Sequence, residues 1–258
     1  MDFTFALLEF EKFILILVRM SCFVVTAPFF NMANTPARTK IGFSIVVSML
    51  LYSVFGTTMV VEYDNDFEYA SLAVKEAVVG LLIGFSANIC MLMVQFAGKI
   101  IDLEIGLAMA SIFDPNTKTE TGIIGTLYYD MVLLLLIVSN LHSYLIMAIK
   151  ETFEIIPIGK MTINPSLYDT FVEFAGAYFS IGFRIALPVF AAILLLNIVL
   201  AIMARVAPQM NMFVVGMQLK IIVGLVVVFI TIGLLPKVSN FIYVQIRQIV
   251  TNVVEGMV

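Results

Sequence analysis

Residues 77–98 read AVVGLLIGFSANICMLMVQFAG, a run of 22 residues without a charged side chain. About 20 apolar residues in an α-helix span the ~30 Å hydrocarbon core of a bilayer. Three further runs without charge cover residues 41–61, 131–149 and 185–204, and two runs interrupted by a few charges cover 10–30 and 212–236. The pattern predicts an all-α, membrane-associated chain with six apolar stretches, each long enough to span a membrane.

The overall composition supports the same fold class. Hydrophobic residues make up 62% of the chain and charged residues 12%, whereas soluble domains have roughly 45–50% and about 25%. A subunit buried in a larger apolar assembly would satisfy this composition as well. With a net charge of −4, the chain has no basic surface for phosphates, so we expect no nucleic-acid partner. Two cysteines and one histidine predict neither a metal site nor a cofactor.

Prolines mark several predicted helix boundaries. Thr35-Pro36 and Asn164-Pro165 are typical of an N-cap residue followed by proline at the first helical position. Pro188 falls inside an apolar run, where it would bend the helix. Pro208 predicts the break before the last apolar run, and Pro236 predicts the end of that run.

The C-terminal tail has a different pattern. Apolar side chains recur every three or four residues, at Val238, Phe241, Ile242, Ile246, Ile249, Val250, Val253 and Met257. Polar and charged residues fill the positions between them. This periodicity predicts an amphipathic helix that docks on a partner or lies at an interface.

Several charged residues lie in or beside the apolar runs, where each costs several kcal/mol, on the order of 2.5–3.5, unless it is paired or hydrated. They are Arg19, Glu76, Asp102, Glu104, Asp130, Arg184 and Lys220. We expect pairing within or between chains, and a polar pathway for ions is the alternative. Lysine and arginine are spread almost evenly over the connections that would alternate across a membrane, so no orientation follows. Either the six stretches do not all cross, or partner chains place the molecule.

Residues 106–122, GLAMASIFDPNTKTETG, have the composition of a loop. Leu107, Met109, Ile112 and Phe113 precede its polar part, although apolar side chains are unusual in a connection between spanning helices. They could pack onto helix ends. Alternatively, the segment could be re-entrant and line or plug a conduit, which is tolerated only where protein or water surrounds it. The residues alone leave both interpretations open.

Three stretches together resemble the FliR family, the export-gate subunit of flagellar type III secretion. The first is residues 76–80 (EAVVG) through Gly84-Phe85, continuing to 95–102 (QFAGKIID), and the others are 106–115 (GLAMASIFDP) and 204–213 (ARVAPQMNMF). Pro36, Arg38, Gly216 and Lys220 also fit the family pattern. The resemblance extends over almost the whole chain, and the similar T-component of virulence type III secretion is the related alternative. The stretch at 204–213 favours the flagellar system.

The resemblance implies a role as part of a channel for unfolded flagellar export substrates, in the bacterial inner membrane at the flagellar basal body. Implied protein partners are FliP, FliQ, FlhB and FlhA, with membrane lipid around them. Residues 1–163 would be a FliP-like helical part, and residues 164–258 a FliQ-like helical hairpin that includes the amphipathic tail. Elongated helical hairpins are therefore the expected architecture.

The resemblance also implies site residues. The plug-forming loop of the family matches residues 106–114, so Leu107, Met109, Ile112, Phe113 and Asp114 would contribute to the seal. Intersubunit or buried charged and polar positions would be Arg19, Arg38, Glu76, Asp102, Arg184, Arg205, Gln209 and Lys220.

Two other function classes stay open. A secondary transporter of a small solute would need an internal repeat with broken helices meeting at mid-membrane, and Pro188 and Pro208 support it weakly. A membrane-embedded enzyme would have to use Asp114, Asp130 or His142. The sequence has no G-x-x-x-x-G-K-[ST] motif, no nucleophile stands at a plausible spacing from a base, and we expect no enzymatic activity. His142 is expected to be a buried, hydrogen-bonded histidine.

Overall fold

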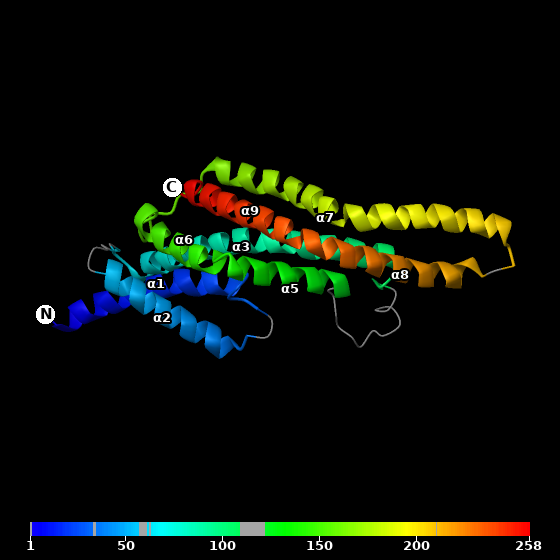
Figure 1. Cartoon of the computed structure of the whole chain (residues 1–258). Helices are drawn as coiled ribbons and strands as arrows, with labels where there is room; N and C mark the ends of the chain where they lie inside the picture. Colours follow the sequence, from blue (N-terminus) through cyan, green and yellow to red (C-terminus); the bar gives the residue numbers. More distant parts are fainter. Residues whose placement is uncertain (1, 33–34, 57–60, 62, 109–121, 210) are drawn as a thin grey trace. The chain divides into compact units, whose positions relative to one another are not determined.

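The computed structural model describes residues 2–32, 35–56, 61, 63–108, 122–209 and 211–258, with side chains from residue 8 onward. These residues form α-helices and one 3₁₀ turn, with no β-strand among them. The helices are α1 (Asp2–Thr26), α2 (Ala37–Phe55), α3 (Asp66–Ile105), α5 (Ile123–Val138), α6 (Leu141–Ile155), α7 (Pro165–Val206), α8 (Met212–Thr231), the 3₁₀ turn η1 (Ile232–Leu234) and α9 (Leu235–Glu255) (Figure 1). The prediction of an all-α membrane protein is confirmed.

The chain forms two compact units, each assembled from several segments. Unit 1 comprises Met1–Cys90, Asn140–Phe174 and Tyr243–Val258, and unit 2 comprises Met91–Ser139 and Ala175–Ile242. The helices α3, α7 and α9 contribute to both units. Each unit therefore combines residues from both sides of position 163/164, and the sequence-based division at that position stays a prediction.

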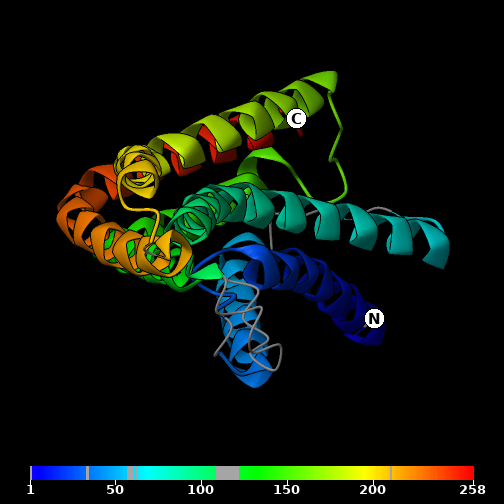
Figure 2. The same ribbon diagram turned by 90° about the vertical axis from the view of Figure 1, so that its right-hand side faces the viewer.

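In unit 1, α1 packs against α2 and α3. α1 and α2 lie side by side in both views (Figures 1 and 2). α3 approaches α1 so closely that a Cβ at Gly80 would lie 2.1 Å from the backbone oxygen of Arg19. The end of the chain is tied to the start of α7, because the amides of Thr162 and Asn164 each donate a 3.1 Å hydrogen bond to the carbonyls of Met257 and Gly256.

In unit 2, the C-terminal half of α3 contacts both α5 and α7. Its contact with α7 is aromatic: the ring of Phe96 lies 5.4 Å from the ring centroids of Tyr178 and Phe179. The Tyr178 hydroxyl also donates a hydrogen bond to the carbonyl of Leu92. α7 and α8 follow each other along the chain as an antiparallel hairpin (Figure 1), with Gly216 of α8 packed on Leu200 of α7.

The helix boundaries largely follow the prolines. α7 begins at Pro165, contains Pro188 and ends before Pro208, as predicted. At the first boundary the helix begins one residue later than expected: Pro36 has ψ 142° and is the N-cap, so Ala37 is the first helical residue. Pro236 does not end the last helical region, because it lies in the first turn of α9, where its missing N–H needs no partner.

The number of spanning segments differs from the six apolar stretches. Four described helical segments are long and apolar enough to cross a membrane: α2, α3, α7 and Met212–Glu255. A fifth is possible if the bent pair α5 and α6 forms one span. The predicted stretch 131–149 is interrupted at Asn140, whose φ of +58° is left-handed. Asparagine tolerates that conformation better than most residues because its short polar side chain bonds locally.

The amphipathic helix at the C-terminus forms as predicted, but its apolar face is covered within the chain. Ile242, Ile246, Ile249, Val250 and Val253 are at most 1% exposed. The intervening Arg247, Gln248, Thr251 and Asn252 are exposed. The expectation that this face docks on a partner or an interface is therefore wrong for the buried positions, because the hydrophobic stripe is covered within its own chain.

Candidate functional site

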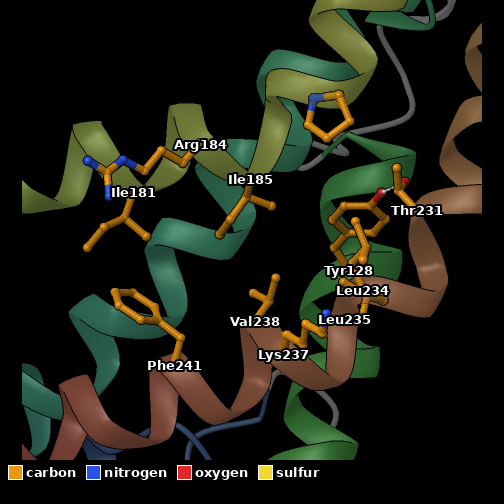
Figure 3. A pocket seen from close by; sticks show the side chains of 11 residues that line it. Tyr128, Ile181, Arg184, Ile185, Thr231, Leu234, Leu235, Lys237, Val238 and Phe241 are labelled. Carbon is orange, nitrogen blue, oxygen red and sulfur yellow. Dashed lines mark hydrogen bonds between the residues drawn. The ribbon is translucent and has the colours of Figure 1, made fainter.

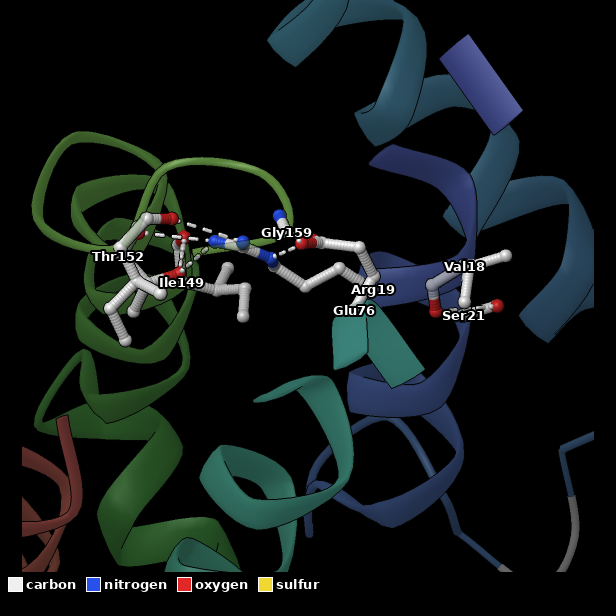
Figure 4. A network of polar contacts seen from close by, with 8 residues as sticks. Val18, Arg19, Ser21, Glu76, Ile149, Thr152 and Gly159 are labelled. Atoms are coloured by element: carbon white, nitrogen blue, oxygen red, sulfur yellow. Dashed lines mark hydrogen bonds and ion pairs between the residues drawn. The ribbon is translucent and has the colours of Figure 1, made fainter. Parts of the chain in front are cut away.

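The guanidinium of Arg19 is fully buried in unit 1 and its three nitrogens all donate hydrogen bonds (Figure 4). Nε donates to the Glu76 carboxylate at 2.6 Å. Nη1 donates to the carbonyl and hydroxyl of Thr152, at 3.1 and 3.3 Å, and Nη2 donates to the carbonyl of Ile156 at 3.1 Å. The guanidinium carbon also lies 4.1 Å from the ring centroid of Phe153. One side chain of α1 thereby adds donors at the C-terminal end of α6, where the carbonyl of Thr152 also accepts from the amide of Ile156 at 2.8 Å.

Glu76 connects the same network to the turn after α6. Its second oxygen accepts a 2.9 Å hydrogen bond from the amide of Gly159, and Lys75 donates to the carbonyl of Gly159 at 3.0 Å. Gly159 has φ +75°, and a Cβ there would lie 2.2 Å from a methyl carbon of Leu72. Only glycine fits this turn without strain. Arg19 and Glu76 thus join α1, α3, α6 and the following turn in one polar network.

Asp102 is the third buried charge of the predicted set, at 2% exposed. It lies near the end of α3 in unit 2. Its carboxylate accepts hydrogen bonds from the amides of Ile124 and Gly125 in the first turn of α5, at 3.1 and 3.2 Å. The site is tight, because a Cβ at Gly122 would lie 1.8 Å from Oδ2 of Asp102. The carboxylate therefore caps a helix that is remote in sequence.

The remaining predicted polar positions are solvent-accessible in the single chain. Arg38, Arg184, Arg205 and Gln209 are exposed, and Lys220 is partly exposed. None of them joins the Arg19 network, and their assignment to subunit contacts stays a prediction.

The predicted seal falls mostly outside the described residues. Met109, Ile112, Phe113 and Asp114 lie in the part of the chain that the structure does not describe, whereas Leu107, directly after α3, is partly exposed. Sequence reasoning identified Arg19, Glu76 and Asp102 from the cost of burying charge, but it missed their partners. The two glycines of Gly122-Ile123-Ile124-Gly125 could have been noticed as a close-contact pattern at the start of α5.

His142 differs from its prediction. Its side chain is only partly buried in α6, and Nδ1 has no hydrogen-bond partner among the described residues. It lies two residues after the break at Asn140, where the chain leaves regular helix. Within the described ranges, no three His, Cys, Asp or Glu side chains come together as a metal site.

A polar cluster lies around the first turns of α1 that carry described side chains. The hydroxyl of Tyr52 donates to Glu9, which also pairs with Lys12 at 2.9 Å. The hydroxyl of Tyr63 donates to Glu11. This bond to a carboxylate is the main cause that raises the pKa of Tyr63 to about 12, because ionisation would place a second negative charge beside the first.

Unit 2 also contains a cavity of about 310 Å³ between α7, the junction of α8 with α9, and α5 (Figure 3). Most of its lining is apolar, and its lining side chains include no carboxylate, histidine or cysteine. The hydroxyls of Tyr128 and Thr231 bond to each other at 3.0 Å. Arg184 extends from α7 beside Ile181 (Figure 3). The lining suits an apolar neighbour and offers no acid–base pair for catalysis.

The fold and these sites define an α-helical integral membrane protein whose buried charges serve to join helices. The family described as "Bacterial export proteins, family 1" matches residues 10–245. The chain is 33% identical over 251 residues to the flagellar biosynthetic protein FliR of Bacillus subtilis, covering 96% of this chain and 93% of that protein. The FliR proteins of Escherichia coli and Aquifex aeolicus are 26% and 28% identical, over 93% and 87% of this chain and 92% and 88% of their own lengths. The chain belongs to this family of bacterial export proteins, the FliR family.

Proposed function

We propose that the chain is a subunit of the flagellar type III protein export gate and forms part of the channel for unfolded export substrates. It would act in the bacterial inner membrane at the flagellar basal body, together with FliP, FliQ, FlhB and FlhA. The names of the relatives, which are flagellar biosynthetic proteins, support the flagellar system. They give no support to a secondary transporter of small solutes.

The structural observation that carries this proposal is that the chain itself covers little of the surface of its long apolar helices. Only 17% of the apolar window of α7 is buried within the chain, and the same share holds for Met212–Glu255 and for α2. Exposed large side chains on α7 include Leu195, Ile198, Val199 and Ile202. Apolar surface on this scale marks contact with lipid or with other chains. In a gate subunit, most of it would be covered by neighbouring subunits.

The channel role assigns a physical task to residues 106–114. Apolar side chains at Leu107, Met109, Ile112 and Phe113 would seal the conduit against ions and move apart for a passing chain, because thioether and aromatic side chains fill irregular gaps. Other components would supply the energy, and this chain would catalyse no reaction. The FliP-like part at 1–163 and the FliQ-like part at 164–258 belong to the same proposal.

Two experiments test the proposal. The tagged chain, extracted in mild detergent, should bring FliP and FliQ with it, whereas a stable lone monomer or homodimer that takes up a solute in liposomes would contradict a gate subunit. Deleting residues 107–113 should leave this co-purification intact and make cells leak ions. Membrane conductance that stays at the wild-type level after the deletion would contradict the sealing role.

A further inference from the structure

We propose that the cavity of unit 2 binds an anionic phospholipid, whose headgroup pairs with Arg184 and Lys237 and whose acyl chain enters the apolar lining. The inference goes beyond the proposed function, because it needs only the membrane location of the chain. Arg184 comes from α7 and Lys237 from α9, on opposite walls of the cavity (Figure 3). Neither side chain forms an ion pair with a described residue, so both cations are available to an anion from outside the chain.

The segment of unit 2 that carries these two residues has charge of one sign only. Residues 175–242 contain no aspartate or glutamate, and their basic residues are Arg184, Arg205, Lys220 and Lys237. The whole chain, by contrast, has a net charge of −4. The described residues that line the cavity include no carboxylate either. An anion in the cavity would therefore meet two cations and no like charge in the lining.

Both cations stand where an apolar run ends. Arg184 directly precedes the run 185–204, and Lys237 directly follows the run 212–236. Because both residues line the same cavity, the two runs end at the same level of the hairpin. As a helix, residues 185–204 cover about 30 Å, which is the thickness of the hydrocarbon core. The cations are therefore at the depth where lipid phosphate groups lie.

The cavity suits the apolar part of a lipid. Its volume of about 310 Å³ lies at the lower end of the range for ligand pockets, about 300–1,000 Å³. The hydroxyls of Tyr128 and Thr231 bond to each other, so the two cations are the polar side chains of the lining that lack a described partner. Leu234 and Phe241 also line the cavity and are 46% and 41% exposed. The cavity thus borders an apolar surface that an acyl chain can reach.

A phospholipid satisfies both properties of the site. Basic pockets between membrane helices bind anionic headgroups, and a cation at the edge of the hydrocarbon core needs a partner or water. A carboxylate from a neighbouring subunit would pair with the cations, but it would place a further charge in an otherwise apolar cavity, with its own cost of burial. A lipid keeps its phosphate at the boundary and places only hydrocarbon in the cavity.

The test measures how much of a defined lipid the purified protein retains. The tagged full chain is extracted in mild detergent together with the subunits that bind it. It is then exposed to phosphatidylglycerol or to phosphatidylcholine with the same acyl chains, and bound lipid is counted by native mass spectrometry. Phosphatidylglycerol should bind at least about tenfold more tightly, because the positive choline group of the other lipid opposes the two cations.

Three variants locate the binding. The double variant Arg184→Gln/Lys237→Gln should bind phosphatidylglycerol at least about tenfold more weakly, because it loses charged hydrogen bonds to phosphate. Arg247→Gln removes one positive charge from the exposed face of α9, away from the cavity, and should bind like the wild type. Val238→Phe keeps both cations but occupies part of the cavity, so it should also weaken binding.

The outcomes separate a lipid from a protein partner. Equal retention of the two lipids by the wild type would overturn the site, and so would a double variant that binds like Arg247→Gln. If the double variant loses FliP and FliQ while its lipid retention is unchanged, the cations pair with a neighbouring protein and the lipid assignment is wrong. If the double variant does not assemble, the single glutamine variants and Val238→Phe decide by the same measurement.

The inference and the proposed function can fail separately. A chain that never co-purifies with FliP and FliQ contradicts the proposed function, whereas the lipid selectivity of that chain still decides whether the cavity is a lipid site.

Discussion

At the scale of single residues, two buried carboxylates are compensated in different ways. Glu76 lies against a guanidinium and an amide, whereas Asp102 lies against two amides at a helix N-terminus. Both arrangements satisfy several hydrogen bonds at once, which is the condition under which a buried charge is tolerated. The cost of losing a partner should therefore be high at either site.

Replacing Arg19 by methionine should destabilise the chain by about 3–5 kcal/mol, because Glu76 becomes an uncompensated buried charge. The carbonyl of Ile156 loses the donor Nη2 as well, and the carbonyl of Thr152 keeps only the amide of Ile156. The free energy of unfolding of the chain in detergent would measure this. The double variant Arg19→Met/Glu76→Gln should lose less than Arg19→Met alone, because glutamine is neutral and still accepts from Gly159. A loss no larger than that of exposed Arg38→Met would contradict the importance of the network.

Gly80→Ala should destabilise the chain by roughly 1–3 kcal/mol, the cost of overpacking. The new Cβ would lie 2.1 Å from the backbone oxygen of Arg19, which cannot move without displacing α1 from α3. Gly42→Ala is the matched control, since nothing lies within 4 Å of its Cβ. It should be neutral or stabilising by about 0.5–1 kcal/mol, because alanine is the better helix former. Thermal melting of the two variants compares them, and equal melting temperatures would refute the close contact.

At the scale of elements, local sequence patterns predicted those helix boundaries and helix faces that depend on neighbouring residues alone. Asn164-Pro165 places the start of α7 and the 3.6-residue periodicity of the tail places α9, since both signals act within one or two turns. The break at Asn140 was missed because the run 131–149 is apolar on both sides, and no glycine or proline marks the turn. The partners of Arg19 could not be predicted either, since they lie 57 to 137 residues away in the sequence.

The burial of one face of α9 predicts a sharp contrast between adjacent positions. Ile249→Asp should destabilise unit 1 by on the order of 3 kcal/mol or more, because it places an unpaired charge where the wild-type side chain is 1% exposed. Gln248→Asp adds the same charge on the exposed face and should change stability by less than about 0.5 kcal/mol. The rate of limited proteolysis within the C-terminal 20 or so residues measures the effect of each variant. Similar cleavage rates in the two variants would show that α9 is not packed on the chain.

At the scale of the whole molecule, hydropathy alone overestimates how many segments are candidates to cross a membrane. Within the part of the chain that the structure describes, the six apolar runs correspond to four candidate spans, or five with the bent pair. α3 is the exception in burial, because 56% of its apolar window is covered within the chain, compared with 17% for α2 and α7. The sequence reports how apolar a helix is, but it does not report what covers the helix. That difference separates a helix of the internal core from one that needs lipid or a neighbour.

A substitution on the exposed apolar face of α7 can distinguish contact with lipid from contact with neighbouring subunits. Leu195→Arg alters a side chain that is 64% exposed. If partner subunits cover this face, the variant should reach the membrane at the wild-type level in cells that lack the other subunits. Co-purification with FliP and FliQ in cells that contain them should fall at least tenfold, because a buried arginine without a partner costs more than about 1.4 kcal/mol.

Ile193→Arg is the matched comparison, two residues away on the buried side of the same helix and 0% exposed. It should reduce the amount of folded chain in both kinds of cell, since the charge enters the core of the chain itself. If lipid covers Leu195 instead, its arginine variant should already be depleted from membranes without the other subunits, because an arginine at the centre of a bilayer costs about 2.5–3.5 kcal/mol. Depletion in those cells would contradict the assignment of this face to neighbouring proteins.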